Sequence, residues 1–398
     1  MIYLTIACFA LLFYSYVGFP VLVSFLATIR PRKWMVDETY RPTVSIILPA
    51  FNEERVIRRC LQSLIGLNYP PEKIEILCGS DGSTDRTNDI LKEMSHEYPF
   101  IRTFFFPVQR GKMLTLNDLV AHARHEILLF IDADVTLNPH AILNHVRHYA
   151  DPSVGGVAGS LQIAGDRNSG AFKSESTFLL IESNLRKKEA EIYSTVGLYG
   201  GNYSVRRTLW KPLPSARVSD DFFAVLTIIG SGLRLLYEEG AVSTELYGRS
   251  YVDEFSRKRR WVPECLAALR IVPGLLLHSP AAWMLWPHKI LRWSTGFLML
   301  GLIAGTIVSY WNGQSWLFPF LVAEAAGAGL VLLGAITSRS RYPLPVATGM
   351  FWFIFMNLAF SVGIIEFIFA RQRPRWVQTT RVAQPSSIAA TPPEAIHS

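Results

Sequence analysis

The sequence predicts an α/β domain with a parallel sheet, held between apolar helices that cross a membrane. Three observations support this fold class. Half of the 398 residues are apolar and 18% are charged, whereas a soluble domain has about a quarter of its residues charged. The apolar residues gather toward the two ends of the chain. Between positions 41 and 260, short apolar runs alternate with amphipathic segments, as in a parallel sheet covered by helices.

The first element is an apolar helix. Ile2 to Ile29 contains no charged residue, and a helix of this length exceeds the ~30 Å hydrocarbon core of a bilayer. A cleaved signal peptide would have basic residues before its apolar core, but here Arg30, Arg32 and Lys33 follow it. We therefore expect a retained anchor. By the positive-inside rule, these basic residues place the following domain in the cytoplasm.

Strands and helices then alternate. We expect strands at Val44–Ala50, Ile74–Gly79, Ile101–Phe106 and Glu126–Ile131, and helices at Glu53–Ile65, Ser83–His96 and Lys112–Arg124. In sheets of this kind, ligands bind beyond the carboxyl ends of the strands. The residues that follow each strand are therefore the candidates for a functional site.

The last third of the chain returns to membrane composition. Further spans are expected at Ser294–Trp311, Ser315–Ile336 and Leu344–Ala370, after an interfacial stretch at Ile271–Pro287. Two of these spans contain Glu324 and Glu366. We interpret both as end-of-helix or packing positions, with a polar path as the alternative. Four spans would leave the Arg-rich tail outside, against the positive-inside rule, so the number of spans stays open.

The predicted organisation has five parts. They are residues 1–30 (N-terminal transmembrane helix), 41–262 (α/β domain), 263–293 (interfacial amphipathic helices), 294–370 (about three transmembrane helices) and 371–398 (a partly disordered tail). The chain would be a multi-pass protein of the inner (plasma) membrane, with its α/β domain in the cytoplasm.

Charge and cysteine content exclude other classes. Lys and Arg number 39 against 32 Asp and Glu, a net +7 that gives no case for nucleic acid. The basic clusters lie beside apolar blocks, which suggests the lipid headgroup layer: Arg30 to Lys33, Arg257 to Arg260, and Arg371 to Arg375. Cys8, Cys60, Cys78 and Cys265 form no CxxC pair, so we interpret them as packing residues in a reducing compartment.

Acidic residues follow two of the predicted strands. Asp81 lies in a turn of small residues, where it could accept a hydrogen bond from a ligand such as a nucleobase. Helix capping by Ser83 or Asp85 explains their presence there but not that of Asp81. Asp132 and Asp134 follow the fourth strand, and two carboxylates so close together suggest a hard divalent cation holding a diphosphate.

A third acidic site opens a later helix. Ser219 could cap this helix, and Asp220 and Asp221 suit a first turn, so a purely structural role is one interpretation. The alternative is that one of the two carboxylates is a general base that takes a proton from an acceptor hydroxyl.

The order of these segments resembles the family 2 glycosyltransferases. The resemblance covers about Val44 to Trp261 and is closest to the membrane-embedded branch with the cellulose, chitin, hyaluronan and poly-N-acetylglucosamine synthases. The matching segments are Pro49 to Glu54 (PAFNEE), Ser80 to Thr87 (SDGSTDRT), Gly111-Lys112 with Asn117, Asp132 to Asp134, Gly200 to Arg207 (GGNYSVRR) and Ser219 to Asp221.

This resemblance implies a GT-A fold, related to the Rossmann fold, that binds a nucleotide sugar and transfers the sugar with inversion. It implies Mg²⁺ or Mn²⁺ as cofactor and a UDP-sugar as the expected donor. It also implies the role of each matching residue. Asp81 would contact the base, Ala50 and Glu53 would line the nucleotide pocket, Lys112 would approach the diphosphate, Asp132 and Asp134 would bind the metal, Asp132 would also contact the donor, Asp220 would bind substrate, and Asp221 would be the base.

One motif departs from the branch. Processive synthases have Gln-x-x-Arg-Trp near the membrane; here Arg260 and Trp261 match, but Arg257 stands at the Gln position. Arg260 would still reach the diphosphate and Trp261 would stack on an acceptor sugar. The alternative is that a basic cluster with a Trp anchors an interfacial helix. A second run, His288 to Trp293, is interpreted as an anchor.

Four functional hypotheses follow. The first is a synthase that extends a polysaccharide or lipid-linked glycan for exopolysaccharide or envelope assembly. The second is single-sugar transfer to a polyprenyl or other lipid acceptor, favoured by the missing Gln and by the small number of spans. A catalytically silent nucleotide-sugar-binding scaffold and a transporter that uses Glu324 and Glu366 are the alternatives of other classes. Expected partners are the donor, the acceptor and the bilayer, with a homo-oligomer or a secretion partner left open.

Overall fold

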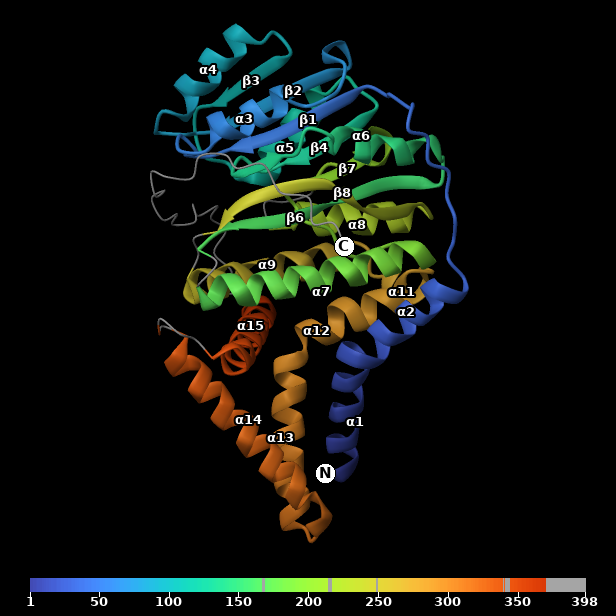
Figure 1. Cartoon of the computed structure of the whole chain (residues 1–398), viewed down its shortest axis with the longest axis vertical. Coiled ribbons are helices and arrows are strands. Elements are labelled where there is room, and N and C mark those ends of the chain that lie inside the picture. The colour runs from blue at the N-terminus through green and yellow to red at the C-terminus, as the bar shows by residue number, and fades with distance from the viewer. Residues whose placement is uncertain (167–168, 214–216, 248–249, 339, 341–343, 370–398) are drawn as a thin grey trace.

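The computed structural model describes residues 1–369, except 167–168, 214–216, 248–249, 339 and 341–343. Figure 1 shows an α/β domain at one end of the molecule and a group of long helices at the other. The α/β domain and the long helices form separate layers, and helices that lie across the domain join them. The predicted tail, 371–398, lies outside the described residues.

The first half of the sheet follows the prediction closely. The strands are β1 (Val44–Ala50), β2 (Ile74–Asp81), β3 (Ile101–Phe106) and β4 (Ile127–Ile131). All three pairings among them, β1 with β2, β1 with β4 and β2 with β3, are parallel. Every residue of β1, β2 and β4 is buried, which is why these strands read as continuous apolar runs. Helices α3 (Ile57–Ile65), α4 (Thr87–Glu97) and α5 (Lys112–His122) connect them.

The second half makes the sheet mixed, which the sequence pattern did not predict. It contains β5 (Val135–Leu137), β6 (Val154–Gly165), β7 (Asn202–Arg206) and β8 (Arg234–Tyr247). Strand β7 is antiparallel to both β4 and β6, β8 is parallel to β6, and β5 is antiparallel to β8. The resulting order is β3-β2-β1-β4-β7-β6-β8-β5. The carboxyl end of β4 therefore faces residues from the later half of the chain.

Three helices lie between the sheet and the apolar helices. They are α7 (Gly170–Ile192), α8 (Asp220–Gly230) and α9 (Tyr251–Ile271). Figure 1 shows α7 and α9 crossing beneath β6 and β8. Because α9 runs without a break through position 262, the boundary predicted there falls inside one helix. The segment predicted to be interfacial contains the end of α9, followed by α10 (Leu275–His278), α11 (Ala282–Leu285), a π-helical turn η5 (Trp286–Ile290) and α12 (Leu291–Trp293).

The remaining helices are long and apolar. The described residues contain three helices long and apolar enough to cross a membrane: Ile2–Ile29, Ser315–Thr337 and Pro345–Ile368. A bent pair, Ala282–Trp293 with Thr295–Trp311, would make a fourth if it forms one span. In secondary-structure terms these are α1 (Ile2–Phe13), the π-helical turn η1 (Tyr14–Gly18), α2 (Phe19–Ile29), α13 (Thr295–Trp311), α14 (Phe318–Thr337) and α15 (Pro345–Ile368).

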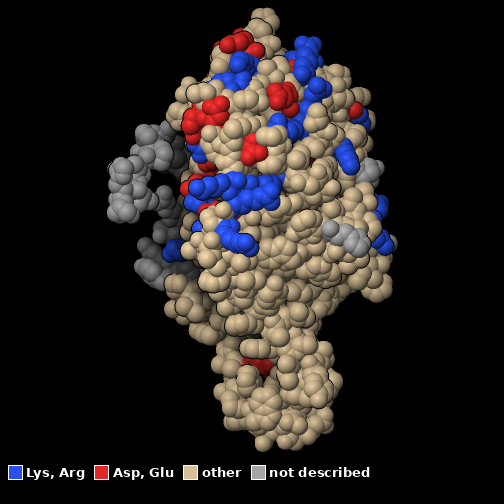
Figure 2. Space-filling model, turned by 90° about the vertical axis from the view of Figure 1, so that its right-hand side faces the viewer, with Lys and Arg blue, Asp and Glu red and all other residues tan. Residues whose placement is uncertain are grey.

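Small residues let these helices approach closely. Gly301 and Gly305, four residues apart on α13, face Cys8 and Thr5 on α1, where added Cβ atoms would lie 2.9 and 2.5 Å from side-chain atoms. All four cysteines are free and buried, which confirms their interpretation as packing residues. Figure 2 shows charged side chains over the α/β domain and almost none over the apolar helices.

The short segments complete the fold. They are α6 (Ala141–Val146) and the 3₁₀ turns η2 (Pro71–Lys73), η3 (Arg147–Ala150), η4 (Arg207–Leu209) and η6 (Ser315–Leu317).

Candidate active site

Asp81 holds the loop that leads into α5. Its two carboxylate oxygens accept backbone N–H groups of Arg110 (2.9 Å) and Gly111 (2.7 Å). Gly111 has φ +102°, a conformation that favours glycine. Asp81 is fully buried. The sequence assigned Asp81 to a nucleobase, whereas in the structure its oxygens hold the segment that carries Lys112; the base contact stays a prediction.

The loops that follow β1 and β2 are hydrogen-bonded to each other. Asn52, at φ +54°, donates its backbone N–H to Ser83 Oγ (3.1 Å) and accepts the Thr84 N–H at Oδ1 (2.8 Å). Asp85 accepts the Glu54 N–H at 3.1 Å. Ser83 and Asp85 therefore join the loops after β1 and β2. Ser83 makes no cap to α4, whereas Asp85 also accepts the first N–H of α4, that of Thr87, at 3.0 Å.

Lys112 lies between two of the predicted acidic residues. Its Nζ is 2.8 Å from Asp132 Oδ1 and 3.4 Å from Asp220 Oδ2. Burial alone would lower the pKa of the Lys112 ammonium, but Asp132 and Asp220 raise it above its ordinary value. Lys112 therefore stays charged, and residues about 110 positions apart in sequence form one polar centre.

Two acids in this centre have raised pKa values. Burial raises the pKa of Asp220 to about 6, with a contribution from Asp221 and Asp132 that Lys112 opposes. Burial also raises the pKa of Glu264, on α9, to about 7, where Asp220 and Asp221 add to the effect and Arg260 opposes it. Acids whose pKa lies near neutrality in a cavity are candidates for proton transfer.

Asp221 is held by its own helix terminus. Its Oδ1 accepts hydrogen bonds from Ser219 Oγ and from the Phe222 backbone N–H (2.6 Å). Ser219 therefore positions Asp221 and makes no side-chain cap to α8, in contrast to the capping interpretation. The N-terminus of α8 also favours the negative charges of Asp220 and Asp221.

Two glycines make room between the acidic residues. A Cβ on Gly200 would contact Asp221 Oδ2 at 3.4 Å, and one on Gly201 would lie 3.2 Å from Asp132 Oδ2 and 2.8 Å from the Tyr199 ring. The GGNYS segment therefore lies against both Asp132 and Asp221. Neither glycine has a positive φ, so a turn does not require them. The close approach of the acidic side chains explains both.

The acidic residues fit a metal ion that arrives with a nucleotide. Among the described residues, no three His, Cys, Asp or Glu side chains lie close enough to hold a metal by themselves. Mg²⁺ is usually bound by one or two carboxylates, and substrate phosphates and water supply its other ligands. Asp132 and Asp134 line the cavity at the end of β4 and would provide that pair.

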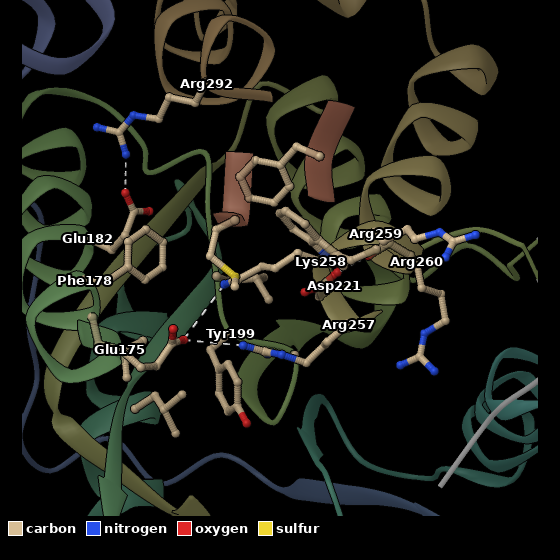
Figure 3. A pocket seen from close by; sticks show the side chains of 18 of the residues that line it. Glu175, Phe178, Glu182, Tyr199, Asp221, Arg257, Lys258, Arg259, Arg260 and Arg292 are labelled. Carbon is tan, nitrogen blue, oxygen red and sulfur yellow. Dashed lines mark hydrogen bonds and ion pairs between the residues drawn. The ribbon is translucent and has the colours of Figure 1, made fainter. Parts of the chain in front are cut away.

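The basic run on α9 lines the cavity, and three of its residues, Arg257, Lys258 and Arg259, are also ion-paired. Arg257 Nη2 lies 2.8 Å from Glu254 and 3.4 Å from Glu175, and Arg259 pairs with Glu366 of α15. Lys258 Nζ lies 3.9 Å from Glu175. Figure 3 shows Arg257 and Lys258 directed toward Glu175 and Arg260 directed away from them.

This pairing corrects the interpretation of the whole run as a headgroup-facing cluster. Arg257 and Lys258 contact Glu175 of α7 because α9 packs beside that helix. Arg260 and Trp261 line the cavity. The residue at the Gln position of the synthase motif is therefore an ion-paired arginine.

The second run, His288 to Trp293, is also more than an anchor. His288 lies between Glu189 (Nδ1 to Oε1, 2.6 Å) and Glu182 (Nε2 to Oε2, 3.0 Å), and it is almost fully buried. Arg292 pairs with the other oxygen of Glu182. Burial alone would raise the pKa of Glu182, but His288 and Arg292 hold it well below its ordinary value. The run thus docks the segment before α13 onto α7.

Most of the charged groups described above line one cavity of about 2490 Å³. At one end lie Glu53, Lys112, Asp132, Asp134, Asp220 and Asp221, and at the other lie Tyr16, Pro20, Trp352 and Phe353 from two of the candidate spans. Arg260, Trp261 and Lys289 also line it. Ala50 is fully buried and, like Asp81, is not among the residues that line the cavity. Ala50 ends β1 inside the sheet, and its predicted place in the nucleotide pocket stays a prediction.

Four residues on the cavity wall belong to none of the motifs assigned a function from the sequence: Glu264, Tyr199, Glu245 and Lys289. Glu264 follows Arg260 by four residues, and this helical spacing was the only signal for it. Tyr199 donates to Glu245 of β8 at 2.7 Å, and both line the cavity. Lys289 lies in the run that was interpreted as an anchor.

Fold and site together define a GT-A glycosyltransferase: a mixed sheet with an acidic centre at the carboxyl end of β4 and a lysine at the start of α5. Residues 45–211 match the model of the family described as Glycosyl transferase family 2. This match covers 167 of the 398 residues and lies within the α/β domain.

Known proteins are similar over different lengths. The probable glycosyltransferase YdaM of Bacillus subtilis is 26% identical over 58% of this chain, which spans 56% of that relative's length. A Methanococcus voltae transferase is 22% identical over 81% of this chain and 97% of its own; its name specifies dolichyl N-acetyl-α-D-glucosaminyl phosphate and a diacetamido-dideoxy-glucuronosyl group. The structure of the mannosyltransferase PcManGT from Pyrobaculum calidifontis, in complex with GDP-Man and Mn²⁺, has a TM-score of 0.71 at 22% identity, covering 93% of this chain and all of that one. This last likeness shows the fold.

Proposed function

We propose that the protein transfers one sugar, with inversion, from a nucleotide-diphosphate sugar to a lipid-linked acceptor at the cytoplasmic face of the inner membrane. The observation that carries the proposal is the single cavity that joins the acidic centre to two candidate membrane spans. An acceptor anchored in the bilayer could reach Asp221 through this cavity without leaving the membrane. The Methanococcus voltae relative, named for a dolichyl-linked acceptor, supports the same class.

In this proposal the donor binds at the end of β4. Asp132 and Asp134 would hold a divalent metal, which would stabilise the negative charge that develops on the leaving diphosphate. Glu53 lines the donor pocket, Asp220 contacts substrate, and Arg260 and Lys112 face the diphosphate. Lys112 is already placed between Asp132 and Asp220, so it can exchange one oxyanion partner for another as the donor arrives.

Asp221 is the proposed general base. The hydrogen bonds from Ser219 and Phe222 converge on Oδ1 and orient the carboxylate, with Oδ2 beside Gly200. The base takes the proton of the acceptor hydroxyl as that oxygen attacks the anomeric carbon. Trp261 offers an aromatic face for the acceptor sugar.

The test uses the purified full chain with a panel of UDP- and GDP-sugars and a membrane extract as the source of acceptor. We expect release of nucleoside diphosphate only with Mg²⁺ or Mn²⁺. Asp221→Asn should lower transfer by about 10²–10⁴-fold and keep nucleotide binding, whereas Asp134→Ala should lose metal-dependent binding. Normal turnover by Asp221→Asn would remove it as the base, and unchanged binding by Asp134→Ala would remove it from the metal site.

Product mass separates this proposal from its alternatives. A lipid acceptor that gains one sugar under excess donor supports single transfer. A ladder of longer products would support the synthase that extends a glycan. Nucleotide binding without any release, across the whole donor panel, would support the catalytically silent scaffold.

A further inference from the structure

Lys289 is a buried cation on the cavity wall that the proposed chemistry does not use. It lies in the turn η5, is only 6% exposed and lines the cavity. Among the residues that the structure describes, no carboxylate lies within 4 Å of its Nζ and no acceptor within hydrogen-bond distance. Burying an ammonium without a partner is costly. An anionic ligand in the cavity would supply the missing partner.

The surroundings of Lys289 are shaped around its end. Its Nζ lies over the Trp261 ring, 6.0 Å from the centroid. A Cβ on Gly197 would lie 2.8 Å from the same Nζ and 3.3 Å from Arg186 Nε. The glycine therefore leaves space for the ammonium, and Trp261 forms a second wall beside it. Trp261 itself packs edge-on against Trp293, with ring centroids 5.7 Å apart.

The charges around this point do not balance. Arg186, Lys289 and Arg292 are three cations, and their neighbouring carboxylates are Glu182 and Glu189. Three against two leaves one positive charge, without counting His288, which bridges both glutamates. The surplus falls on Lys289, since Arg186 and Arg292 are both within 4 Å of Glu182.

Lys289 lies between the acidic centre and the membrane helices. Gly197 lies against Lys289, and Gly200 lies against Asp221. The two glycines are three residues apart, so their Cα atoms are separated by at most about 11 Å. On the other side, Ser15 Oγ of the first candidate span donates to the Pro287 carbonyl in the same turn as Lys289 (2.8 Å). An anion at Lys289 would thus have an acceptor sugar on one side and lipid on the other.

We propose that Lys289, beside Trp261 and Gly197, binds the phosphate that links the acceptor's sugar to its lipid. This inference rests on the proposed function and names the chemical class of its acceptor: an isoprenoid or other lipid phosphate bearing a sugar. The apolar chain would lie toward Tyr16 and Phe353, and the sugar would bridge the step from Lys289 to Asp221. A neutral glycolipid would leave the ammonium without a partner.

Direct binding tests the phosphate site without turnover. The probes are farnesyl phosphate and farnesol, titrated into the purified full chain in neutral detergent by microscale thermophoresis. We expect the wild type to prefer farnesyl phosphate at least tenfold, and Lys289→Gln to bind both equally. Lys289→Arg should restore the preference, and Lys187→Gln, an exposed control on α7, should match the wild type. Equal binding of both probes by the wild type would overturn the proposal.

Three further measurements identify the source of the anion and exclude a structural role. Inorganic phosphate should not displace farnesyl phosphate at equal concentration; if it does, a free anion is the ligand and the lipid assignment is wrong. UDP and GDP affinities should be the same in wild type and Lys289→Gln; a tenfold loss would assign Lys289 to the donor. Farnesyl phosphate should raise the unfolding midpoint of the wild type, while Lys289→Met keeps the ligand-free midpoint and loses this shift. A low ligand-free midpoint in Lys289→Met would make Lys289 structural.

The outcome for this site is separable from that of the proposed function. If no nucleotide sugar is cleaved but farnesyl phosphate binding depends on Lys289, the proposed function fails and the lipid-phosphate site stands. If the donor is cleaved and transferred while the probes bind alike, the transferase stands and the phosphate site fails.

Discussion

The buried carboxylate of Glu182 allows a quantitative test of how the membrane-side segment is held to α7. Its side chain is 5% exposed and faces His288, Arg292 and Arg186. Glu182→Gln keeps the size of the side chain and removes its charge, so Arg292 and Arg186 lose their shared counter-ion. Breaking a buried pair from one side costs about 3–5 kcal/mol. At about 2–4 °C per kcal/mol for a domain of this size, the unfolding midpoint should fall by roughly 6–20 °C.

The assay is tryptophan fluorescence during heating, at one scan rate and in one detergent, because unfolding of such proteins is often irreversible. Glu191→Gln is the matched control on the same helix; it removes a more exposed pair with Lys188 and should change stability by less than about 1 kcal/mol. Since the folded-state pKa of Glu182 is depressed, its stabilisation is present above about pH 4.3, the ordinary pKa of glutamate, and is lost at lower pH. A midpoint for Glu182→Gln within about 2 °C of wild type at pH 7 would refute this reasoning.

Two further predictions concern other parts of the molecule. The raised pKa of Glu264, about 7, means that the folded protein keeps a proton that the unfolded chain loses near pH 4.3, so stability falls as the pH rises toward 7. Glu264→Gln should flatten this slope in unfolding midpoints measured from pH 5 to 8; an unchanged slope would contradict the assignment. On α14, Gly334→Ala should lower the midpoint because its Cβ would lie 2.0 Å from the Ala347 carbonyl oxygen, whereas Gly329→Ala, with open space, should not. Equal midpoints would show that α14 and α15 pack differently.

The sequence predicts the first half of the sheet, because each of its strands can be recognised from its own run of residues. Strands β1, β2 and β4 are largely apolar and buried along their whole length, and the ends of β2 and β4 give the positions of Asp81 and Asp132. Strand β6 begins with Val154, Gly155 and Gly156, a composition that weakens any strand signal. Both glycines are needed because Cβ atoms there would lie within 3 Å of Leu209 and Ile228 side chains, contacts that the local sequence does not reveal.

The same limit applies to the site. The acidic motifs are short and contiguous, so their residues could be named, but the role of Asp81 in holding Gly111 depends on a loop 29 to 30 residues away. Glu182 and Glu189 look like ordinary helix-surface residues, seven apart on α7. Their partners, His288 and Arg292, come 99 to 110 residues later. Burial decides that these charges are structural, and burial follows from the packing of distant helices.

The ion pair between Lys112 and Asp132 has a consequence for the order of events in the proposed reaction. The lysine is a tethered competitor for the carboxylate that the metal would use, and its local concentration never changes. A divalent ion alone would offer Lys112 no partner in exchange for Asp132, whereas a bound diphosphate would give Lys112 another anion. Asp132 would therefore become available to a metal mainly when a nucleotide diphosphate is bound, and metal alone would bind weakly.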